Sequence, residues 1–154
     1  MHVTHITSDD IEDICDMAEL MHEENASSLP FERDVVKRKA EFIIENNTDI
    51  CCIIARNDEG KAVGFLVGNI CYYFFNSYVF AQQELVHVRR EHRGSSAFLR
   101  LIQAYENWLE ARGAIQAIIG VVRNTPEEYQ PIADTFGKLS YHPAGYYFKK
   151  EIKQ

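Results

Sequence analysis

The segment from Phe80 to Trp108 passes from a strand through a short turn into a helix, and this order restricts the fold more than any other feature of the chain. Residues 80–88 carry the aromatic and β-branched side chains that are typical of strands. The residues at 94–97 are small, and apolar residues then recur every three to four positions, as in a helix. A strand joined this closely to a helix predicts an α/β protein.

Similar patterns divide the rest of the chain into strands and helices. Strands are expected at 3–6, 50–55, 62–75, 80–88, 115–122 and 146–152. Helices are expected around 11–21, 36–44, 97–108 and 126–139. The sequence has no internal repeat or linker, so we expect a single domain over 1–154. One long hairpin among alternating helices and strands predicts an α/β (α+β) fold, in which helices cover both faces of a mixed sheet.

Several classes of protein are disfavoured by composition and spacing. The apolar runs are shorter than the roughly 20 residues of a spanning helix, and the N-terminus lacks the features of a signal peptide. We therefore expect a cytoplasmic protein without a membrane partner. The cysteines and histidines show no ligand-like spacing, so no metal site is predicted.

Negative charge is concentrated near the N-terminus of a chain whose formal charge is −7. Residues 1–31 contain no lysine or arginine but eight acidic residues: Asp9, Asp10, Glu12, Asp13, Asp16, Glu19, Glu23 and Glu24. This charge argues against a nucleic-acid partner and would suit a cationic substrate. A solvated helix face explains the same pattern, so the two interpretations stay open.

Positive charge, in contrast, gathers at the turn after the strand that ends at Val88. Four arginines surround the small residues of the turn: Arg89, Arg90, Arg93 and Arg100. A helix N-terminus presents unpaired N–H groups and partial positive charge, so this turn could bind a pyrophosphate. The alternative is a plain turn with solvated arginines. Neither the P-loop motif nor an early G-x-G-x-x-G is present, which disfavours those two classes of nucleotide site.

The sequence around this turn resembles motif A of the GNAT superfamily, the Gcn5-related N-acetyltransferases. The similar stretch runs from Val86 through Arg93-Gly94 to Ile102. Three further phrases resemble the family in the same order along the chain: Ala62–Gly68, Trp108–Ala114 and Phe136–Gly145. The resemblance therefore covers nearly the whole chain.

This resemblance implies a sheet that is splayed between its fourth and fifth strands, with acetyl-CoA lying in the splay. The pantetheine arm of acetyl-CoA would then pair with the backbone of Val86, His87 and Val88. The pyrophosphate would lie on the turn formed by Arg93, Gly94, Ser95, Ser96, Ala97 and Phe98, and Asn124 would contact the cofactor arm. Dimers are common in the family, so the resemblance leaves both a monomer and a homodimer open.

The chain departs from the family pattern at three positions. Ser96 and Phe98 replace small residues of the phosphate-binding phrase, and Phe136 replaces the tyrosine that commonly protonates the departing thiolate. A hydroxyl at Ser96 can still donate to phosphate, whereas the ring of Phe98 must turn into the core. The loss of the phenol at Phe136 leaves the general acid unassigned.

The reaction implied by the resemblance is attack of a primary amine on a thioester. The amine must lose a proton, and Glu84 is the first candidate for the general base, with His87 second. Regular alternation along a strand predicts that Glu84 and His87 face opposite sides of the sheet. The aromatic segment Tyr72–Phe80, the loop at 25–30 and the acidic first helix are expected to border the amine acceptor, which could be cationic. A non-catalytic module that binds CoA or a protein partner is the alternative.

Overall fold

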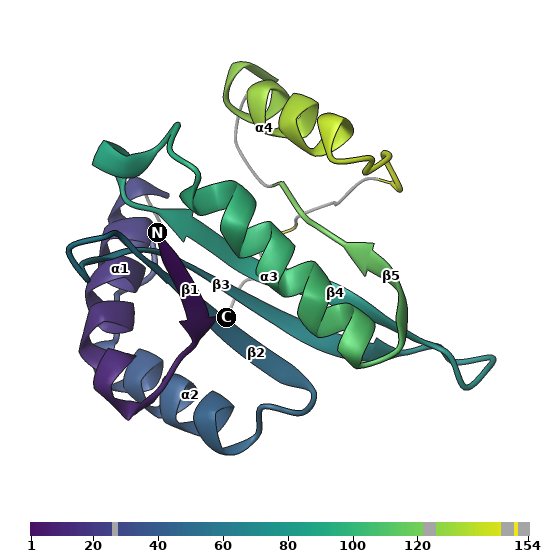
Figure 1. Ribbon diagram of the computed structural model, residues 1–154, viewed down its shortest axis with the longest axis horizontal. Helices are drawn as coiled ribbons and strands as arrows, with labels where there is room; N and C mark the ends of the chain where they lie inside the picture. The colour runs from purple at the N-terminus through teal and green to yellow at the C-terminus, as the bar shows by residue number, and fades with distance from the viewer. Residues whose placement is uncertain (26–27, 122–125, 146–149, 151–154) are drawn as a thin grey trace. The chain divides into compact units, whose positions relative to one another are not determined.

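The computed structural model describes residues 1–25, 28–121, 126–145 and 150 (Figure 1). Asn124 and the predicted final strand at 146–152, apart from Lys150, lie outside the described residues. The chain forms two compact units, Met1–Ile119 and Gly120–Gln154, and each is described by itself.

The first unit is built on a five-stranded sheet whose strands follow one another in chain order. They are β1 (His2–His5), β2 (Ile50–Arg56), β3 (Ala62–Tyr72), β4 (Val79–Val88) and β5 (Ala114–Ile118). The first four pair antiparallel, and β5 pairs parallel to β4. The predicted mixed sheet is thus confirmed, although β5 ends at Ile118, before the expected 122.

Helices lie on both faces of this sheet, as predicted. These are α1 (Ile11–Glu24) and α2 (Arg33–Glu45) on one face and α3 (Ala97–Ala111) on the other, with short 3-10 turns at Ser8–Asp10 and Arg90–His92 (Figure 1). The second unit contains α4 (Pro126–Lys138). No helix in the described ranges combines the length and the apolar character needed to cross a membrane.

Alternation along β3 separates two layers of core. Phe65 and Val67 point toward α1 and α2, where they join an apolar cluster with Ile14, Met17 and Ala40. Gly64 and Gly68 lie on the opposite face under α3. A Cβ on Gly68 would lie 2.4 Å from Cε2 of the fully buried Tyr105, so glycine permits the close approach of α3 to the sheet.

A buried carboxylate ties the start of α1 to the sheet. Asp10 forms an ion pair with Arg56 of β2 and accepts hydrogen bonds from the backbone and hydroxyl of Thr7. Burial alone would raise the pKa of Asp10, but the hydrogen bonds from Arg56 and Thr7 and the charge of Arg56 outweigh it and lower the pKa. The folded state therefore favours the ionised form.

This pairing predicts a pH dependence of stability. The contribution of Asp10 is present above its ordinary pKa of 3.8 and is lost as the pH falls through the lower pKa of the folded state. We expect Asp10→Asn to lower the free energy of unfolding by about 1–3 kcal/mol at pH 7, with little effect near pH 2. Urea unfolding at both pH values measures this. Asp9→Asn, at an exposed neighbour, is the control, and an equal loss in both variants would contradict the assignment.

Candidate active site

Among the described residues, part of the outer edge of the fourth strand has no strand partner. Its parallel ladder with β5 runs from the pair Val79–Ala114 to the pair Gln82–Ile118. Beyond Gln82, β4 continues to Val88 and, within the described ranges, pairs only with β3. The backbone edge of 83–88 is therefore available for an extended ligand, at the place where the two strands separate.

A β-bulge lies directly at this separation. Val67 pairs with Leu85 and the next residue, Gly68, pairs with Gln83, so Glu84 is an extra residue on β4. Its side chain is exposed and accepts a hydrogen bond from Nδ2 of Asn69 on β3. The bulge thus places a carboxylate in the interior of β4, close to the fork, which is the point after Gln82 where the pairing of β4 with β5 ends.

The same bulge changes the phase of the strand. His87 is opposite Phe65, and the centroids of their two rings are 6.1 Å apart. Phe65 and Asn69 lie on one face of β3, so His87 and Glu84 share that face too. The prediction that they point to opposite sides was wrong, because the extra residue interrupts the alternation. The His87 side chain is only 5% exposed, whereas that of Glu84 is accessible.

The predicted phosphate-binding turn connects β4 to α3. Gly94 has φ +86°, which favours glycine, and a Cβ there would meet no atom within 4 Å, so the space beside the turn is open. Ser95 and Ser96 are exposed, and Oγ of Ser95 accepts a hydrogen bond from the Ala97 amide at 3.2 Å. Ala97 is buried and Phe98 is half-buried at the start of α3.

The arginines around this turn have protein partners. Nε of Arg89 donates to the Ala62 carbonyl at 2.9 Å, and Nε of Arg93 donates to the Val88 carbonyl at 2.9 Å. Arg93 also forms an ion pair with Glu24, the last residue of α1, and Nε of Arg90 lies 3.8 Å from the same carboxylate. One carboxylate therefore offsets part of the positive charge that Arg93 and Arg90 could offer to an anion.

The charge of Glu24 is stabilised by this arrangement. Burial would raise its pKa, but the hydrogen bond and charge of Arg93, with the charges of His87 and Arg90, lower it. Glu24 is ionised at neutral pH and occupies the side chains that the sequence assigned to a phosphate. An incoming anion would compete with it for Arg93 and Arg90.

The acidic face of α1 is largely paired. Arg33 of α2 contacts Glu12, Asp16 and Glu19 within 3.6 Å. With the pairs made by Arg56 and Arg93, the acidic residues of 1–31 that have a cationic partner are Asp10, Glu12, Asp13, Asp16, Glu19 and Glu24. These contacts favour the structural interpretation of the acidic helix over a role in attracting a cation.

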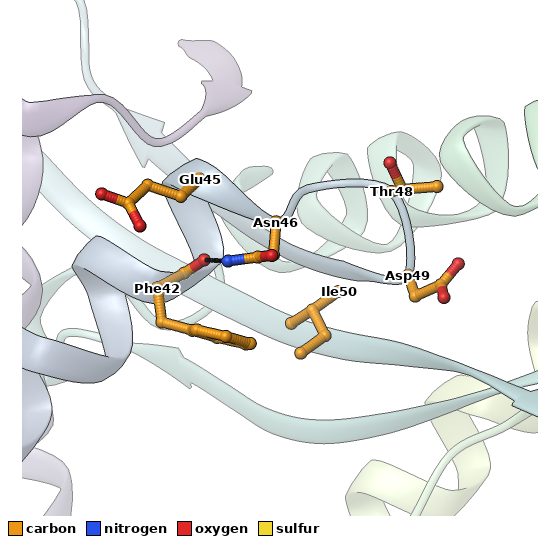
Figure 2. A pocket seen from close by; sticks show the side chains of 6 residues that line it. All are labelled: Phe42, Glu45, Asn46, Thr48, Asp49 and Ile50. Atoms are coloured by element: carbon orange, nitrogen blue, oxygen red, sulfur yellow. Dashed lines mark hydrogen bonds between the residues drawn. The ribbon is translucent and has the colours of Figure 1, made fainter.

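Two adjoining hollows lie between α2 and the sheet. The inner one, of about 190 Å³, is lined by Lys39, Phe42, Ile43, Ile50, Val67, Asn69 and Glu84. The outer one, of about 410 Å³, is lined by Phe42, Glu45, Asn46, Thr48, Asp49 and Ile50 (Figure 2). Phe42 and Ile50 belong to both. We call the inner hollow the α2 groove. Its lining includes the candidate base Glu84 and residues of α2, whereas the sequence had indicated that the first helix, α1, would border the acceptor.

The aromatic hairpin between β3 and β4 projects its tip into solvent. Phe74 and Phe75 are 93% and 91% exposed, and Tyr72 and Tyr78 are exposed as well. The hydroxyl of Tyr73 instead donates a hydrogen bond to Oε1 of Gln116 on β5, and its ring packs against that of Phe80. Much of this segment is thus exposed to solvent, and the lining of the α2 groove includes none of its residues.

The second unit contains Phe136, the position at which the family usually has a tyrosine. The ring of Tyr141 meets the ring of Phe136 edge-on, with their centroids 5.3 Å apart. A phenol therefore lies next to the side chain that lacks one. Neither its hydroxyl nor any other group is assigned as the general acid.

Three residues at these sites were not identified from the sequence. Asn69 positions Glu84, Glu24 forms an ion pair with Arg93, and Lys39 lines the α2 groove. Asn69 lies opposite Gln82 in the hairpin register, two residues before Glu84. The register alone would therefore not indicate Asn69 as the partner of Glu84; the position of the bulge is needed as well. The described residues hold no group of three or more His, Cys, Asp or Glu suited to a metal ion.

Comparison with known proteins connects this geometry to a family. Residues 11–128 match the family model described as acetyltransferase (GNAT) family. No curated protein matches the chain.

Solved structures of low sequence identity share the fold. An aminoglycoside antibiotic 6′-N-acetyltransferase from Acinetobacter baumannii is 20% identical, with TM-score 0.74, over 99% of each chain. Glucosamine-6-phosphate N-acetyltransferase from Arabidopsis thaliana is 13% identical, with TM-score 0.78, over 99% of this chain and 98% of that one. Ribosomal-protein-alanine N-acetyltransferase from Brucella melitensis is 16% identical, with TM-score 0.70, over the whole of both chains.

Proposed function

Because the chain belongs to the acetyltransferase (GNAT) family, we propose that it is an acetyl-CoA-dependent N-acetyltransferase that acts on a primary amine. One observation carries the proposal. The edge of β4 beyond its pairing with β5 has an exposed carboxylate at one end, Glu84, and the open, arginine-bordered turn at Gly94 at the other. A ligand with a reactive end, an extended arm and a phosphate end matches that order.

The residues present fit acetyl-CoA. The edge of β4 from Val86 to Val88 offers backbone groups to the pantetheine arm. The turn from Arg93 to Phe98 offers the N-terminus of α3 and open space beside Gly94 to the pyrophosphate. The half-buried ring of Phe98 leaves Ser95 and Ser96 exposed, so the departures from the family phrase do not fill the turn. We also assign Asn124 to the cofactor arm, on the family resemblance alone.

When bound, acetyl-CoA supplies an acetyl thioester that a neutral amine can attack. We assign to Glu84 the removal of the amine proton, because its carboxylate is exposed and held by Asn69 at the fork. His87 is the weaker candidate, because its side chain is almost fully buried. Its backbone stays assigned to the cofactor arm.

The acceptor amine is cationic before it loses its proton, and Glu84 provides the matching charge. The carboxylates of α1 give little support to a highly cationic acceptor, because most of them already pair with arginine or lysine. The α2 groove, which contains Glu84, supports an acceptor that enters from the side of α2.

Phe136 is the observation that favours a non-catalytic CoA-binding module as the second candidate function. A turnover assay separates the two. The protein is incubated with acetyl-CoA and a panel of primary amines, and free CoA thiol is measured. Amine-dependent release of CoA is expected of an enzyme. If CoA binds but no amine increases thiol release, the binding module takes the place of the enzyme.

The pair between Glu24 and Arg93 predicts an unusual gain in affinity. Removing the negative charge in Glu24→Gln frees Arg93 and Arg90 for the pyrophosphate, so we expect acetyl-CoA to bind about three to ten times more tightly. Isothermal titration calorimetry at fixed ionic strength measures the change.

Glu23→Gln is the matched control, since Glu23 is exposed and has no ion pair among the described contacts. Its affinity for acetyl-CoA should stay within about twofold of the unaltered protein. Weaker binding by Glu24→Gln would mean that Glu24 positions Arg93 for the cofactor and does not compete with it.

A further inference from the structure

The α2 groove brings two opposite charges to one apolar hollow. Lys39, Phe42 and Ile43 are spaced i, i+3 and i+4 along α2, so they share one face of that helix. Ile50, Val67, Asn69 and Glu84 line the hollow from three neighbouring strands. A lysine of the helix and a carboxylate of the sheet therefore line one hollow together with four apolar side chains.

The two charged side chains differ in the partners that the protein provides for them. The Glu84 carboxylate accepts a hydrogen bond from Asn69, which fixes its position. Among the described contacts, Lys39 has no ion pair, whereas its neighbour Lys37 has Glu12 within 3.5 Å and Arg33 has three carboxylates. Lys39 is thus a cation of the groove for which the described part of the chain shows no ion pair.

The remaining lining of the groove is suited to a hydrocarbon body. Phe42 is 51% exposed, and its ring lies beside Ile50 (Figure 2). Ile43 and Val67 complete the apolar wall. A ligand that covers Phe42 would remove this apolar surface from water.

We propose that the acceptor is an amino acid in the broad sense: an amine joined through an apolar body to a carboxylate or another oxyacid anion. The amine would lie at Glu84 and the anion at Lys39. This inference rests on the proposed function for the identity of the reacting group. It narrows the acceptor from amines in general to zwitterions, and it disfavours polyamines, since a second cation would lie at Lys39.

Matched probes test the proposal. The set contains ω-amino carboxylates with three to six methylene groups, the n-alkylamines and α,ω-diamines of equal length, and the corresponding aminoalkyl phosphonates. Binding to the CoA-loaded protein is measured by calorimetry, and turnover is measured by CoA release. We expect the best amino carboxylate or phosphonate to bind about 5–10 times more tightly than its alkylamine, with the diamine weakest. The phosphonate arm shows which oxyacid the groove prefers.

Charge variants locate the preference. Lys39→Met should abolish it, and Lys39→Glu should invert it in favour of the diamine. Arg38→Met, at the exposed neighbouring position that does not line the groove, should leave it unchanged. All three variants should keep the affinity for acetyl-CoA, since none of these side chains lies at the Arg93 turn.

The outcomes separate this inference from the proposed function. Equal binding of amino carboxylates and alkylamines, or a preference that survives Lys39→Met, would overturn the inference while amine acetylation stands. If binding depends on Lys39 but no amine causes release of CoA from acetyl-CoA, the groove assignment is supported and the acetyltransferase activity is refuted.

Discussion

Glu84→Gln is expected to lower kcat for amine acetylation by about 100-fold or more, because general-base catalysis contributes roughly 10²–10⁴-fold. The glutamine keeps the size of the side chain and a carbonyl oxygen that can accept from Asn69, but it cannot take the amine proton. Acetyl-CoA affinity should be unchanged. The residual rate should rise with pH toward the pKa of the amine, about 10, because the amine must then deprotonate without the carboxylate.

Steady-state kinetics across pH measures this effect. Glu41→Gln is the matched control, since Glu41 is an exposed glutamate of α2 that does not line the groove. It should retain nearly full activity. If Glu84→Gln keeps more than about half of kcat at neutral pH, the proton goes elsewhere and His87 becomes the next residue to alter.

Gly68→Ala is expected to be among the most destabilising single substitutions in the first unit. The added Cβ would lie 2.4 Å from Cε2 and 2.9 Å from Cζ of Tyr105, which is fully buried between α3 and the sheet. The ring cannot move aside without displacing α3. We expect a loss of about 3 kcal/mol in the free energy of unfolding, with Tm lower by roughly 6–12 °C.

Two further variants make this prediction specific. Gly137→Ala adds a methyl group that meets no atom within 4 Å, so it should be neutral or slightly stabilising. Combining Gly68→Ala with Tyr105→Leu should cost less than the sum of the two single changes, because the leucine lacks the atoms that clash. Strict additivity in thermal unfolding would contradict a direct contact as the cause.

Much of the fold could be predicted from local sequence patterns. The core-facing residues of α1 and α3 recur at helical spacing, so the periodicity indicated both helices. The small residues at 94–97 indicated the turn into α3, and the left-handed conformation of Gly94 explains why glycine stands there. These features depend on short stretches of sequence, which is why they could be recognised.

The candidate site was less predictable because it depends on contacts between distant residues. A single extra residue in β4 turned Glu84 onto the face of His87. Gly68, at the same register shift, indicates a bulge or a close approach, but it does not show which residue of β4 is extra. The lysine that lines the same groove as Glu84 comes from α2, which precedes β4 in the chain by three elements. Charge counts left two interpretations of the acidic helix open, since they cannot show that Arg33 and Arg56 form ion pairs with four of its carboxylates and with Asp10 just before it.

The most direct test of the central claim is the thermal unfolding of the protein with and without acetyl-CoA, with ATP as the control anion. Acetyl-CoA at about 100 times its Kd should add about 2.7 kcal/mol of stability, which corresponds to a rise in Tm of roughly 5–10 °C. ATP at the same concentration should produce a much smaller rise, because it lacks the arm that pairs with β4. No rise with acetyl-CoA, or an equal rise with ATP, would contradict a CoA site built from the β4 edge and the Arg93–Phe98 turn.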